Sequence, residues 1–188
     1  MTAFDFISVA LSFVVGLSIT HLLVSAVSVF RLRRHLQLDW MPLAWASSIL
    51  LFQFQFWWAI YELAGIVRQW TFYGFAGMIA LALCLFVAGS LVLPVAERDC
   101  ERDQLAVFDR DGRWGLAFLA TYFAISLWAN WYFWDVSAYS YFGALILAQL
   151  AIPLIFLGTG NRRAQRALTL VHVVLSAWTV VTISPSTY

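Results

Sequence analysis

Six long apolar stretches, separated by short polar segments, dominate the pattern of this chain. They run over Phe4–Phe30, Trp40–Val67, Phe72–Pro94, Trp114–Trp134, Ala138–Gly158 and Ala167–Ile183. A helix of about 20 apolar residues crosses the hydrocarbon core of a bilayer, so each stretch is long enough, or nearly long enough, to span it. The pattern predicts an all-α membrane protein, with residues 1–188 forming a single bundle of six transmembrane helices.

The basic residues predict the orientation of these spans. The chain has no lysine, and ten of its 11 basic residues lie in three short segments: Arg31, Arg33 and Arg34; Arg98, Arg102, Arg110 and Arg113; Arg162, Arg163 and Arg166. Arginines accumulate in the cytoplasmic loops of membrane proteins. We therefore expect these three segments in the cytoplasm and both termini outside. Residues 95–113 are expected as solvated surface, either a loop or a short helix at the membrane interface, with a regulatory or docking role as the alternative.

Composition agrees with a membrane location. Hydrophobic residues make up 63% of the chain, charged residues make up 11%, and the mean hydropathy is +0.82. A soluble domain of this size needs more polar surface. The lipid bilayer is thus the expected partner, and the net charge of +1 offers no basic face for a nucleic acid.

Two faces can be read along the first span. Small side chains recur every fourth residue, a spacing that permits close helix packing and favours a homo-oligomer; they are Ser8, Ser12, Gly16 and Thr20. A second, polar face gathers on a helical wheel roughly opposite the first, with Ser18, His21, Ser25 and Ser28.

Both intramembrane histidines are candidates for function. An ionisable group inside a span needs a partner or water, and His21 lies nine residues from the end of its stretch. His172 stands in a similar row on the last span, with Thr169, Ser176 and Thr179. If the first and last helices were neighbours, the two rings could meet. The pair would then have one of three roles: a structural hydrogen bond, proton transfer or ligation of haem iron. Proton transfer is a candidate because histidine changes its charge near neutral pH.

The second span carries the most polar and aromatic surface. Gln55 and Glu62 are seven residues apart and share one helix face. Asn130, near the end of the fourth stretch, is a candidate neighbour, and Arg68 or a tyrosine would alternatively neutralise Glu62. These residues predict a polar path, with Glu62 and Gln55 at the outer side, His21 at the centre and His172 as its partner.

Known catalytic patterns are missing from the sequence. We find no phosphate-binding GxxxxGK[ST] loop, no HExxH zinc motif, no CxxC pair and no GxSxG elbow. Ser25 and His21 lie four residues apart, but no oxyanion-hole motif accompanies them. An enzyme is therefore not the favoured class, and no resident cofactor or metal is expected.

Short motifs in the first half resemble a group of small, uncharacterised bacterial multi-pass membrane proteins. The motifs are the segment at 15–23 (VGLSITHLL), QFWW at 55–58, WTF at 70–72 and LVLP at 91–94. The resemblance implies a bacterial inner-membrane location and supplies no activity.

Three functions follow from these observations. The preferred function is passage or sensing of a proton or small ion along the polar path. The second is a redox protein in which His21 and His172 bind haem b, or in which Trp57, Trp58 and Tyr61 wall a quinone pocket. The third is a scaffold or subunit whose polar faces bind another membrane protein.

Overall fold

The chain is all-helical wherever its structure is described. The computed structural model describes residues 3–31, 33, 38–67, 69–93 and 104–183. Its helices are α1 (Ala3–Arg31), α2 (Trp40–Ile66), α3 (Phe72–Val92), α4 (Gln104–Val107), α5 (Arg113–Trp134), α6 (Tyr141–Gly158) and α7 (Arg162–Ile183). A π-helical turn over Phe108–Gly112 joins α4 to α5. Six of the resulting helical segments are long and apolar enough to cross a membrane, which is compatible with the predicted multi-pass protein.

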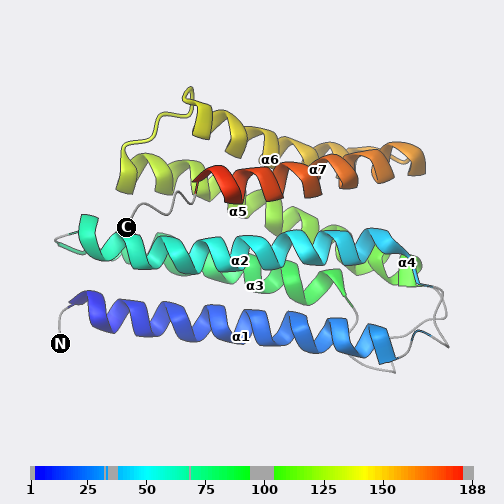
Figure 1. The fold of residues 1–188 in the computed structure, drawn as a ribbon, viewed down its shortest axis with the longest axis horizontal. Coiled ribbons are helices and arrows are strands. Elements are labelled where there is room, and N and C mark those ends of the chain that lie inside the picture. Colours follow the sequence, from blue (N-terminus) through cyan, green and yellow to red (C-terminus); the bar gives the residue numbers. More distant parts are fainter. Residues whose placement is uncertain (1–2, 32, 34–37, 68, 94–103, 184–188) are drawn as a thin grey trace.

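The helices run up and down between two ends of the bundle (Figure 1). We call the end where α1 finishes and α7 begins the arginine end, because Arg31 and Arg162 lie there. The other end, where α2 and α5 finish, is the Glu62 end. The described parts of the three arginine-rich segments all lie at the arginine end, in agreement with the predicted alternation of the loops.

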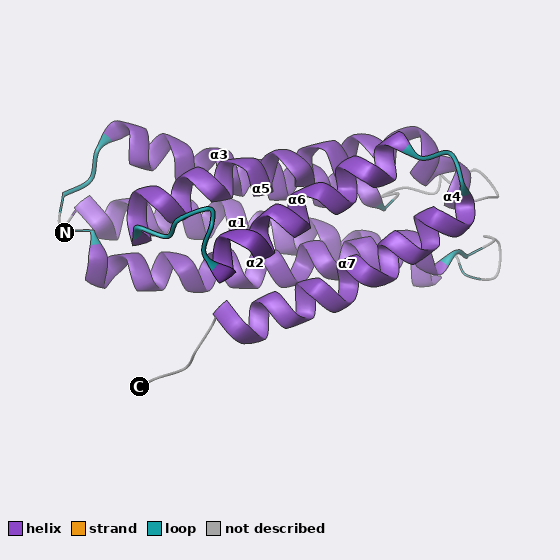
Figure 2. Ribbon diagram, turned by 90° about the horizontal axis from the view of Figure 1, so that it is seen from above, coloured by secondary structure: helices purple, strands orange, loops and turns teal. Residues whose placement is uncertain are grey.

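Five of the long helices form a closed ring. Helix α2 packs on α7, α7 on α6, α6 on α5, α5 on α3, and α3 back on α2 (Figure 2). Helix α1 lies outside this ring, against α2 and α3. In Figure 1, α2 separates α1 from α7. The first and last spans are therefore not packed as neighbours.

Helix α1 turns its polar face, and not its small-residue face, toward the rest of the chain. Ser18 and Ser25 are buried, and the amide Nε2 of Gln53 donates to Ser18 Oγ at 2.7 Å. In contrast, an added Cβ at Gly16 would meet no atom within 4 Å, and Thr20 is exposed. The small-residue face is thus not used for packing within the described part of the chain. That a second copy packs against Ser8, Ser12, Gly16 and Thr20 stays a prediction.

Side-chain caps define where several helices begin. Asp39 Oδ1 accepts from the backbone N–H of Met41, Thr71 Oγ1 from Gly74, and Ser140 Oγ from Gly143. These bonds satisfy N–H groups that the first turn leaves without a carbonyl partner. Helix α5 ends at Asp135, whose φ of 53° is left-handed, a conformation that aspartate adopts more readily than most residues.

Two helices extend further toward the arginine end than predicted. Residues 104–112 were expected in a solvated loop or a short separate helix, but they are helical and continue into α5. Helix α7 begins at Arg162, five residues earlier than predicted. Phe108 is buried in this extension, with its ring against Phe156. Charged residues end an apolar stretch, yet they do not end a helix, because arginine and aspartate remain compatible with helical backbone.

Candidate functional site

The structure brings Gln55, Glu62 and Asn130 together in one cavity. This Glu62 cavity has a volume of about 260 Å³ and lies at the Glu62 end of the ring, between α2, α3, α5 and α6. Five aromatic side chains form much of its wall: Phe56, Trp58, Tyr122, Trp134 and Phe142. Three polar residues that lie far apart in the sequence therefore share one space.

Glu62 is held by its own helix. The indole Nε1 of Trp58, one turn earlier, donates to Glu62 Oε1 at 2.8 Å. None of the ion pairs between described residues includes Glu62. Arg68, the predicted cationic partner, lies outside the described residues. Asn130 Nδ2 donates to the carbonyl oxygen of Ser126, which leaves its amide oxygen available to the cavity.

A smaller cavity continues inward from the Glu62 cavity. Its volume is about 50 Å³, and four residues line both spaces: Gln55, Tyr122, Ser126 and Asn130. Its inner wall is formed by Gln149 and Thr179, with Phe52 and Phe123 beside them. A bound water needs about 10–15 Å³ of such volume, so the smaller cavity has room for a few waters.

Beyond this cavity, buried polar side chains follow one face of α7. The row consists of Gln165, Thr169, His172, Ser176 and Thr179, all at most 4% exposed. Gln149 Nε2 lies 3.4 Å from both Ser176 Oγ and Thr179 Oγ1. The hydroxyls of Thr169 and Ser176 donate to carbonyl oxygens one turn earlier, on Gln165 and His172. The row therefore reaches from the smaller cavity to the arginine end of α7.

His172 stands at the middle of this row and is wholly buried. Its imidazole stacks on the indole of Trp45, with ring centroids 4.3 Å apart and an interplanar angle of 30°. The rings of Phe52 and Phe123 lie 6.4 and 6.1 Å away, so the same two side chains that wall the smaller cavity also touch the imidazole. Neither ring nitrogen has a hydrogen-bond partner among the described residues. Buried polar groups are nearly always paired, so an unpaired imidazole marks a functional candidate.

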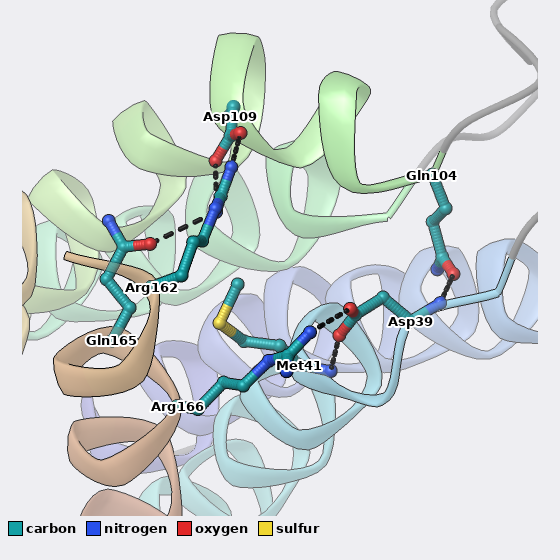
Figure 3. A network of polar contacts seen from close by, with 7 residues as sticks. All are labelled: Asp39, Met41, Gln104, Asp109, Arg162, Gln165 and Arg166. Atoms are coloured by element: carbon teal, nitrogen blue, oxygen red, sulfur yellow. Dashed lines mark hydrogen bonds and ion pairs between the residues drawn. The ribbon is translucent and has the colours of Figure 1, made fainter. Parts of the chain in front are cut away.

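At the arginine end, polar contacts tie the start of α7 to Asp39, which caps α2, and to Asp109 in the π-helical turn before α5 (Figure 3). The guanidinium of Arg162 pairs with both carboxylate oxygens of Asp109 and donates to Gln165 Oε1 at 3.0 Å. Arg166 lies 3.6 Å from Asp39, whose backbone N–H donates to Gln104 Oε1. These partly exposed ion pairs add little stability individually. They place fixed charges at the point where the buried row of α7 meets solvent.

His21 lies elsewhere. Its Nδ1 is 3.4 Å from Ser90 Oγ, and its ring packs edge-on against Phe86 of α3, outside the ring of five helices. Ser25 Oγ donates to the backbone oxygen of His21 and not to its imidazole. The arrangement therefore gives no support to a serine nucleophile activated by His21.

The predicted haem site does not fit this arrangement. Axial ligation by two histidines needs both imidazoles on one iron. His21 contacts α3, whereas His172 contacts α2 and α5, and no contact joins the two rings. Among the described residues there is also no group of three His, Cys, Asp or Glu side chains that could hold a metal ion. The two histidines cannot converge because α1 does not pack against α7 as a neighbour.

Of the three aromatic residues predicted to wall a quinone pocket, one lines a cavity. Trp58 lines the Glu62 cavity, while Trp57 and Tyr61 are 48% and 63% exposed on the outer surface of α2. Their direction follows from the helical period, since positions 57, 58 and 61 do not share one narrow face.

Two buried polar contacts were not predicted from the sequence. The indole Nε1 of Trp45 donates to Thr169 Oγ1 at 3.0 Å, and Gln53 bonds Ser18. A hydrogen-bond acceptor for Trp45 could have been predicted, because a buried indole N–H requires one. Which helix supplies that acceptor depends on the packing alone.

The chain was compared with protein-family models, curated proteins and solved structures. No family model, curated protein or solved structure matches it.

Proposed function

We propose that the protein conducts protons across a membrane, through the interior of the five-helix ring. The observation that carries the proposal is the buried imidazole of His172, whose two nitrogens have no partner among the described residues, in a polar row that starts at the smaller cavity beside the Glu62 cavity. The path we propose starts at Glu62, Gln55 and Asn130 and continues through Gln149 and Thr179 to His172. It then follows Thr169 and Gln165 to the ion pairs at the arginine end.

The dimensions of the path favour protons over larger ions. The smaller cavity has room for a few waters, which can relay protons by hydrogen bonding. Phe52 and Phe123 line that cavity and also contact the imidazole, and in our proposal a movement of these rings completes the transfer to His172. Histidine is suited to the central position because one ring nitrogen can accept a proton while the other releases one, as in a proton shuttle.

His21 has no place on this path. The hydrogen-bonding groups inside the ring belong to α2, α5, α6 and α7, whereas α1 lies outside. We therefore assign the central titratable role to His172, with His21 as a packing residue between α1 and α3.

Proton flux into liposomes tests the proposal. The purified protein is reconstituted with an internal pH dye, and a potassium diffusion potential drives the flux. We expect flux that depends on the protein and falls at least about tenfold in His172→Phe, because phenylalanine can stack on Trp45 but cannot carry a proton. His21→Phe is the matched control and should retain the flux.

Two results would overturn the proposal. One is an equal flux in the wild type and in His172→Phe. The other is wild-type flux no greater than that of empty liposomes; in that case, reproducible co-purification of a membrane protein would favour the scaffold or subunit function.

We also propose a bacterial inner membrane with the arginine end in the cytoplasm. The resemblance of the first half and the three arginine-rich segments support this orientation. In a cysteine-free background, an impermeant thiol reagent applied to intact cells should label Ser137→Cys at the Glu62 end. It should leave Gly160→Cys at the arginine end unlabelled until the cells are opened. The reverse pattern would invert the orientation.

A further inference from the structure

The walls of the Glu62 cavity have the chemistry of a site for an organic cation. Glu62 is the one charged side chain among the described residues that line it. The ion pairs between described residues lie at the arginine end and do not include Glu62. A carboxylate without an ion-pair partner among the described residues can receive a cation from outside the chain.

Aromatic side chains line the same cavity as that carboxylate. Phe56, Trp58, Tyr122, Trp134 and Phe142 come from α2, α5 and α6, and helix packing brings them round one space. The faces of aromatic rings attract alkylated ammonium groups, and desolvation strengthens the attraction. Trp58 contributes twice, because its indole N–H also orients the carboxylate of Glu62 at 2.8 Å.

The small number of polar groups in the cavity lining favours binding of an alkylated ammonium over binding of a metal ion or another inorganic cation. One carboxylate and the amide groups of Gln55 and Asn130 are the main polar groups of the lining, and most of the wall is apolar. Metal ions such as Ca²⁺ require six or more oxygen ligands. A quaternary ammonium has no N–H to satisfy and needs only one compensating charge and apolar contact.

From these observations we infer that the Glu62 cavity binds a small quaternary ammonium compound. The inference concerns the outer cavity of the proposed proton path, but it needs no conduction. Binding is therefore measured without a proton gradient, so that this inference and the proposed function can fail separately.

Choline is the probe, and its uncharged isostere 3,3-dimethylbutan-1-ol is the matched ligand. Equilibrium binding of radiolabelled choline to the purified protein in mild detergent should be saturable. The alcohol should not displace choline at a tenfold excess, because it has the same shape and lacks the charge. Displacement by the alcohol at choline's own concentration would show a merely apolar pocket and overturn the inference.

Variants of the carboxylate and of the wall complete the test. Glu62→Gln should weaken choline binding by at least about tenfold, whereas Glu62→Asp, which keeps the charge, should stay within about threefold of the wild type. Trp134→Leu should weaken binding severalfold, and Trp131→Leu, which alters an exposed ring outside the cavity lining, should not. Each protein is first shown to elute as the wild type does. Absence of saturable wild-type binding, or equal binding by a well-folded Glu62→Gln, would overturn the inference.

Discussion

Replacing Gly143 with alanine should lower the midpoint of thermal unfolding by about 4–12 °C. This range follows from a loss of about 2–3 kcal/mol of stability and about 2–4 °C for each kcal/mol. Gly143 lies in the first turn of α6, where the connection from α5 folds back over it. A Cβ at this position would lie 2.5 Å from the backbone oxygen of Ala138 and against that of Ser137. Backbone atoms of a capped turn cannot rotate away as a side chain does. The turn or the helix must therefore shift, and the cap from Ser140 would weaken with it.

Gly65→Ala is the matched control for this change. Gly65 lies inside α2, and an added Cβ there would meet no atom within 4 Å. Alanine is the better helix former by about 1 kcal/mol, so the unfolding midpoint should stay the same or rise slightly. Both midpoints are read from the loss of the monodisperse protein peak after heating in detergent. A Gly143→Ala protein as stable as the wild type would contradict the packing described for this turn.

Trp45→Ala should destabilise the protein by about 3–5 kcal/mol, the usual cost of deleting a large buried aromatic side chain. Trp45 is wholly buried, stacks on His172 and packs edge-on against Phe156 at 5.5 Å. Its indole N–H also donates to Thr169, so the substitution removes packing from α6 and α7 and a hydrogen bond from the centre of the ring.

Two further tryptophan variants separate these contributions. Trp57→Ala removes a side chain that is 48% exposed on the same helix, and we expect a loss below about 1 kcal/mol. Trp45→Phe keeps most of the stacked ring but not the donor, so its unfolding midpoint should fall between those of the wild type and Trp45→Ala. Equal losses in Trp45→Ala and Trp57→Ala would show that Trp45 does not pack the ring interior.

The apolar pattern was sufficient to predict the number and approximate limits of the spans. Each helix must satisfy its backbone hydrogen bonds internally and must be long enough to cross hydrocarbon, and both requirements are local. The same pattern placed the arginine-rich segments at one end, because two spans, an even number, separate each of these segments from the next. It misplaced the beginnings of α5 and α7, since a charged turn can extend a helix beyond its apolar part.

The candidate functional site was predictable only in part. Spacing along α2 placed Gln55 and Glu62 on one face, and spacing along α7 placed Thr169, His172, Ser176 and Thr179 on another. Both rows follow from the 3.6-residue period of a helix. The sequence also suggested Asn130 as a neighbour of Glu62, and the structure places both in one cavity.

Tertiary packing alone decided which rows meet. It placed α7 against α2 and α1 outside the ring, so that His172 stacks on Trp45 while His21 contacts Ser90. It also collected aromatic side chains from three helices around Glu62. The helical period shows which residues share one face of a helix. Which faces pack on each other depends on how whole helix surfaces fit together, and no short segment of the sequence encodes that fit.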